Sequence, residues 1–97
     1  MKIGILRADL QIPSSGSLKE KRKVIRSLKD RLAARFNISV AEIGDQDIHQ
    51  RSQIGISFVA IDGKSALSTM QKLKEFINSH PGAIVLAIDD EVLHEDG

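Results

Sequence analysis

A strand and a helix follow one another in residues 2–36, which read KIGILRADLQIPSSGSLKEKRKVIRSLKDRLAARF. In residues 2–12 small or aliphatic side chains occupy every second position, which is the period of a strand with one buried face. The inward set is Gly4, Leu6, Ala8, Leu10 and Ile12. After a break at residues 13–16, apolar side chains recur at helical spacing, as expected for a helix with one buried side. These side chains are Leu18, Ile25, Leu28, Leu32 and Phe36.

The rest of the chain continues this alternation. Strands are predicted at residues 38–43 and 53–61, with a polar connection at residues 44–51 between them. A second helix follows a turn at residues 62–65, and a fourth strand is predicted at residues 83–88. The order β-α-β-β-α-β is that of the ferredoxin-like, or split βαβ, fold. We therefore predict an α+β protein whose four-stranded antiparallel sheet carries two helices on one face.

Length and composition indicate one ordinary folded domain spanning residues 1–97. The chain is 41% hydrophobic and 28% charged, has no cysteine and carries a net charge of +1. The tail from residue 89 contains five acids and no Lys or Arg, so we expect it to be solvated and frayed. No signal peptide or transmembrane stretch is recognisable, which favours a cytoplasmic protein with no membrane association.

The sequence favours a non-enzymatic role. No cysteine nucleophile exists, and none of the three histidines stands in a recognisable Ser-His-Asp arrangement. Asp45, Asp47 and His49 alternate in the polar connection and are of the types that ligate metals. Their alternative role is structural, with Asp45 or Asp47 pairing with Arg51 to shape the turn. We predict neither a metal site nor a cofactor.

The first helix concentrates positive charge. Residues 19–35 hold eight of the 14 basic side chains and only two acids, a local charge of +6 in a chain of +1. Such a surface attracts polyanions, although a solvated helix face is the alternative. The residues predicted to contact RNA phosphates are Lys19, Lys21, Arg22, Lys23, Arg26 and Arg51.

The sheet face without helices is predicted to carry aliphatic side chains. They are Ile3 and Ile5 from the first strand and Val59 and Ile61 from the third, with Val85 from the fourth. An apolar patch on an exposed sheet usually marks an interface, so we predict a homodimer formed through this face. Scattered surface aliphatics are the alternative.

The third strand resembles the RNP1 motif of RNA-recognition domains only weakly. Gly55, Phe58 and Val59 match, but Ile56 stands where a stacking aromatic is expected. Base stacking requires aromatic faces. Phe58 is therefore predicted to belong to the core, and RNA would be bound by charge on the helix and the loop.

Several short motifs together resemble the bacterial YlxP-like family of uncharacterised small proteins. They are Ser17–Arg22, Phe36–Glu42, Asp45–Asp47, Gln50–Arg51 and His80–Gly82. The resemblance implies a ferredoxin-like fold, no established catalytic activity and no known cofactor. Genes of this family often lie beside those of a translation initiation factor and ribosome-binding factor A, which implies rRNA or a ribosomal subunit as partner. The polar positions that carry the resemblance are Lys19, Glu20, Lys21, Arg22, Glu42, Asp45, Asp47, Gln50 and Arg51.

Two functional hypotheses follow. The first is a non-enzymatic module associated with RNA or the ribosome, with the basic helix on phosphates and the open sheet face used for dimerisation. The alternative is a homodimeric protein-interaction or regulatory adaptor that binds no nucleic acid.

Overall fold

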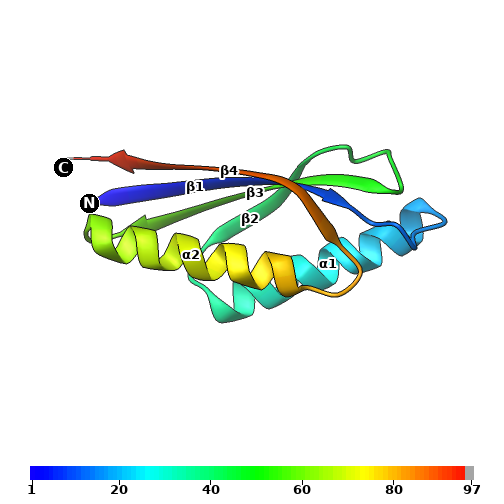
Figure 1. Ribbon diagram of the computed structural model, residues 1–97, viewed down its shortest axis with the longest axis horizontal. Coiled ribbons are helices and arrows are strands. Elements are labelled where there is room, and N and C mark those ends of the chain that lie inside the picture. Colours follow the sequence, from blue (N-terminus) through cyan, green and yellow to red (C-terminus); the bar gives the residue numbers. More distant parts are fainter. Residues whose placement is uncertain (96–97) are drawn as a thin grey trace.

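Two helices and four strands occur in the predicted order in the computed structural model, which describes residues 1–95. The elements are β1 (Lys2–Gln11), α1 (Leu18–Arg35), β2 (Ser39–Gly44), β3 (Arg51–Ala60), α2 (Gly63–Ser79) and β4 (Ile84–His94). The strands form one antiparallel sheet in the order β2-β3-β1-β4. Both helices lie on the same face of this sheet (Figure 1). The predicted ferredoxin-like fold is thus confirmed.

The core lies between the sheet and the two helices. The inward set predicted for the first strand is buried, and α1 and α2 each contribute a buried stripe. The buried hydrophobic residues of the helices are Ile25, Leu28, Leu32, Ala66, Met70, Leu73 and Ile77. Neither α1 nor α2, the two helices in the described part of the chain, combines the length and apolar character needed to span a bilayer.

The expectation of a frayed acidic tail from residue 89 was wrong for residues 89–94. These residues continue β4 and pair with the first half of β1, from Arg7↔Asp89 to Lys2↔His94. The long first strand leaves backbone donors and acceptors that need partners, and the tail satisfies them. Asp89, Asp90 and Glu91 remain exposed, so the pairing buries no acid. Residues 96 and 97 of the predicted tail lie outside the described residues.

The prediction that Val85 lies on the open face was also wrong. Val85 pairs with the buried Leu10 and packs against the core. A register shift between Asp9 and Leu10 places one additional residue in β4. Because side chains alternate between the two faces of a strand, such a bulge changes which residues face the helices.

Candidate functional site

Helix α1 begins at a capped N-terminus. The Ser17 hydroxyl accepts a hydrogen bond from the Glu20 backbone N–H at 3.2 Å. The Glu20 carboxylate accepts one from the Gly16 backbone N–H at 2.6 Å, one residue before the position typical of a capping box. The first bond satisfies a donor that the first turn would otherwise leave unpaired, and the second fastens the strand-to-helix connection to the helix. The cationic helix therefore has a defined start and direction.

Four exposed cations form what we call the basic stripe: Lys19, Arg22, Lys23 and Arg26. Their spacing of three and four residues places them on one side of α1. Within residues 1–95 none of the four makes an ion pair with a carboxylate. The charge of the stripe is therefore not neutralised by an ion pair with any described residue, and all four side chains are exposed to solvent.

Lys21 departs from the prediction. Its side chain is fully buried, and its ammonium donates to the backbone carbonyls of Asp45 at 2.7 Å, Gln46 at 3.0 Å and Arg51 at 3.2 Å. The same ammonium lies 3.0 Å from the Glu42 carboxylate. A side chain without exposed surface cannot reach a phosphate. Lys21 is therefore removed from the phosphate-contacting set and assigned to the interior.

Lys21 instead holds the connection between β2 and β3. Within this connection the Ile48 N–H donates to the Asp45 carbonyl at 3.1 Å, and Asp45 adopts a left-handed backbone with φ of 59°. The Gln50 carbonyl accepts from the Ile12 N–H at 2.9 Å. The connection is thereby fastened to both α1 and the end of β1. It presents Arg51 and His49 as exposed side chains at this end of the molecule.

The predicted pairing of Asp45 or Asp47 with Arg51 is absent from residues 1–95, because neither carboxylate makes an ion pair. The main chain of Asp45, rather than its carboxylate, shapes the turn by accepting from Lys21. Within the described part of the chain no three His, Cys, Asp or Glu side chains are grouped closely enough to hold a metal ion.

The open face, meaning the side of the sheet without helices, carries Ile3, Ile5 and Val59 of the aliphatic residues expected there. Ile5 is 40% exposed and Val59 68%, whereas Ile3 is half-buried between its partners Val59 and Leu93. Ile61 is 86% exposed but lies one residue beyond the end of β3, so the register of the sheet does not place it on this face. A groove of about 450 Å³ continues across this face. Its lining includes Ile5, Arg7, Ala41, Ile43, Gly55 and Ser57.

Two further candidates are buried. Phe58 is 5% exposed and faces the helices, so it belongs to the core as predicted and cannot stack on a base. His80, at the end of α2, is 6% exposed. Burial lowers the pKa of His80, the nearby Arg31 charge lowers it further, and a hydrogen bond with the Val24 backbone partly opposes both. His80 therefore favours its neutral form and adds no charge to the basic stripe.

Comparison with known proteins identifies relatives of unassigned function. Residues 3–90 match the family model described as "Protein of unknown function (DUF503)". The chain is 38% identical over 79 residues to the uncharacterized protein YlxP of Bacillus subtilis (strain 168), a match that covers 81% of this chain and 86% of that protein. Among solved structures, a de novo designed protein with a ferredoxin fold aligns with a TM-score of 0.46 and 13% identity, over 100% of this chain and 88% of the designed one.

Proposed function

We propose that this chain is a non-enzymatic RNA-binding module. The chain belongs to the DUF503 family of unknown function, in agreement with its predicted resemblance to the YlxP-like family. The observation that carries the proposal is the basic stripe. Its four cations are exposed on one side of α1 and make no ion pair within residues 1–95, in a chain whose net charge is only +1. The proposed partner is rRNA or a ribosomal subunit, which would make the cytoplasm its place of action.

The stripe suits contacts with the phosphate backbone rather than with bases. It covers residues 19–26, a rise of about 10 Å along α1 at 1.5 Å per residue. Cations that replace condensed counterions give binding that weakens steeply with salt and carries little sequence information. The Lys21 ammonium donates to the backbone carbonyl of Arg51 and so holds this residue near the start of the helix. The exposed Arg51 side chain adds one more cation there.

Charge reversal on the stripe is expected to weaken RNA binding at least tenfold. The variant Arg22→Glu/Lys23→Glu would be titrated against an rRNA fragment by fluorescence anisotropy at several salt concentrations. Its matched control is Lys64→Glu/Lys72→Glu on α2, which alters the same number of exposed lysine or arginine charges. We expect the control to change the affinity less than threefold. Equal losses in both variants would show that binding follows net charge and not the stripe.

We propose in addition that the open face forms a homodimer, the arrangement required by the alternative adaptor function. The register places Ile3 between Val59 and Leu93, so these aliphatic side chains adjoin one another across three strands. Contiguous exposed apolar surface of this kind favours an interface more than isolated aliphatics do. Dimerisation is compatible with RNA binding, because the basic stripe lies on the helical side of the sheet.

Substituting glutamate for Val59 is expected to weaken the proposed dimer at least tenfold, because it buries a charge in an apolar contact. The control is Leu67→Glu on α2, since Leu67 is 66% exposed and Val59 is 68% exposed. Sedimentation velocity over a range of concentrations measures the dissociation constant. A wild-type protein that stays monomeric at every concentration would eliminate this interface.

A further inference from the structure

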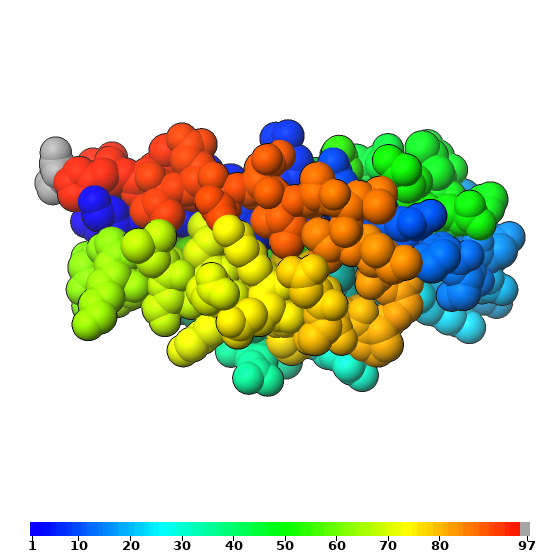
Figure 2. Space-filling model, in the orientation of Figure 1, coloured from blue at the N-terminus to red at the C-terminus, as the bar shows by residue number. Residues whose placement is uncertain are grey.

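Strand β4 forms an edge of the sheet that no other element of the described chain covers. It is the last strand in the order β2-β3-β1-β4 and pairs only with β1. With 11 residues it is the longest strand, and it contains no proline. Figure 2 shows its side chains along the upper border of the molecule, above those of α2. The outer N–H and C=O groups of such a strand are a ready template for another extended chain.

The side chains of β4 follow a definite order on the open face. Ala87, Asp89, Glu91 and Leu93 lie opposite alternate residues of β1, from Asp9 to Ile3, and so share one side of the strand. This order is apolar, acidic, acidic, apolar.

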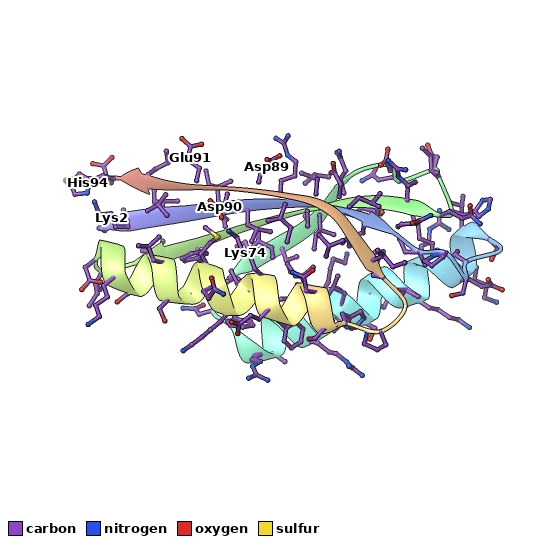
Figure 3. The ribbon with its side chains drawn as sticks, viewed as in Figure 1. Lys2, Lys74, Asp89, Asp90, Glu91 and His94 are labelled. Atoms are coloured by element: carbon purple, nitrogen blue, oxygen red, sulfur yellow. The ribbon has the colours of Figure 1, made fainter. Side chains whose placement is uncertain are left out.

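The acids of β4 divide between the two sides of the sheet. Asp90 points to the helical side and pairs with Lys74 of α2, whereas Asp89 and Glu91 extend away from the helices (Figure 3). Within residues 1–95 neither of these two carboxylates makes an ion pair. A strand added at this edge would place its own side chains about 5 Å from theirs.

Charge argues against a second copy of this chain at the edge. Two antiparallel β4 strands would bring the acids of one copy close to those of the other, which is destabilising. The other edge strand, β2, offers Ser39, Ala41 and Ile43 on the open face and has no cation there. A heterologous partner with basic side chains is the complementary occupant.

We propose that the free edge of β4 binds a basic, extended segment of another protein by strand addition. The matching segment has an aliphatic residue, two Lys or Arg residues and a second aliphatic residue at alternate positions. Backbone hydrogen bonds would supply affinity, and the pairs with Asp89 and Glu91 would select the segment. The edge of β4 borders α2, whereas α1, which carries the basic stripe, packs against β2 (Figure 1). Strand addition at β4 is therefore expected to be independent of RNA binding at the stripe.

A labelled peptide tests the proposal directly. The probe is acetyl-Thr-Ile-Thr-Lys-Thr-Lys-Thr-Val-Thr-amide, and its control has Glu in place of both Lys. Fluorescence anisotropy should show saturable binding of the Lys peptide by the full chain and none of the Glu peptide. The variant Asp89→Asn/Glu91→Gln should bind the Lys peptide at least fivefold more weakly. Two control variants should bind the Lys peptide no more weakly than wild type. One is Asp30→Asn/Asp47→Asn, which removes two exposed acids elsewhere, and the other is Arg22→Glu/Lys23→Glu in the stripe.

Backbone methylation distinguishes strand addition from loose ionic attraction. Methyl groups on the peptide nitrogens that face β4 should abolish binding, whereas methyl groups on the alternate nitrogens should be tolerated. The proposal is overturned if the Lys peptide does not bind, if Asp89→Asn/Glu91→Gln binds as well as wild type, or if both methylated series bind equally. Failure of RNA binding in the stripe variant would leave this result unchanged, so the two proposals are tested separately.

Discussion

Replacing Lys21 with methionine is expected to lower the free energy of unfolding by about 3–5 kcal/mol, the range for removing one partner of a buried ion pair. The substitution keeps the length of the side chain but removes an ammonium that contacts three carbonyls and the Glu42 carboxylate. Glu42 is 17% exposed and would retain only the hydroxyl of Ser52, at 2.6 Å, as a side-chain partner. Each buried acceptor left without a donor costs free energy.

Urea unfolding followed by circular dichroism measures this loss. Lys23→Met is the matched control, because Lys23 is exposed on the same helix two residues later, and we expect a change within about 0.5 kcal/mol. Glu42→Gln keeps an acceptor near the ammonium and should cost less than Lys21→Met. A loss below about 1 kcal/mol for Lys21→Met would show that the carbonyls find other donors.

The expected damage is localised first in the connection from residue 45 to residue 51. Three of the Lys21 contacts are to its main chain, which otherwise has few bonds to the rest of the molecule. Amide exchange should therefore accelerate there before it accelerates in the core strands. The position of Arg51 depends on the same contacts. Lys21 is buried and cannot touch RNA, but it positions Arg51, which is proposed to contact RNA.

Adding a methyl group at Gly4 is the second change with a large expected effect. Gly4 lies directly opposite Phe58, and a Cβ atom at Gly4 would overlap the phenyl ring. The ring is nearly buried and cannot swing into solvent. We expect Gly4→Ala to cost about 1–3 kcal/mol through overpacking, and Phe58→Ala to cost about 3–5 kcal/mol through the loss of a large core side chain.

A double-mutant cycle identifies the cause of the Gly4 effect. In Gly4→Ala/Phe58→Leu the smaller side chain makes room for the methyl group, so the combined loss should be less than the sum of the two single losses. Gly16→Ala is the control, because a Cβ atom there would meet only the Glu20 carboxylate, at 3.4 Å. Additive losses in the cycle would exclude steric conflict with the ring. Thermal unfolding is the measurement.

The candidate site was predictable in part. Lys19, Arg22, Lys23 and Arg26 were recognisable because their spacing puts them on one side of a helix whose opposite side is apolar. Lys21 was assigned to the same surface because it belongs to the same cationic stretch, residues 19–35. It lies close to the apolar side of the helix, where a long side chain can point either way. The acceptors that draw it inward lie 24 to 30 residues further along the chain. No local pattern in α1 contains that information.

The amino-acid sequence alone determined the elements, their order and the inward face of β1, because the periods of strands and helices are local properties of the backbone. Tertiary structure alone decided that Lys21 is an interior cation and that residues 89–94 are strand and not tail. Both outcomes depend on polar groups that only the folded chain brings together, such as the Asp45 carbonyl and the outer edge of β1. A buried donor or acceptor must find its partner wherever the fold places one, however distant that partner is in the sequence.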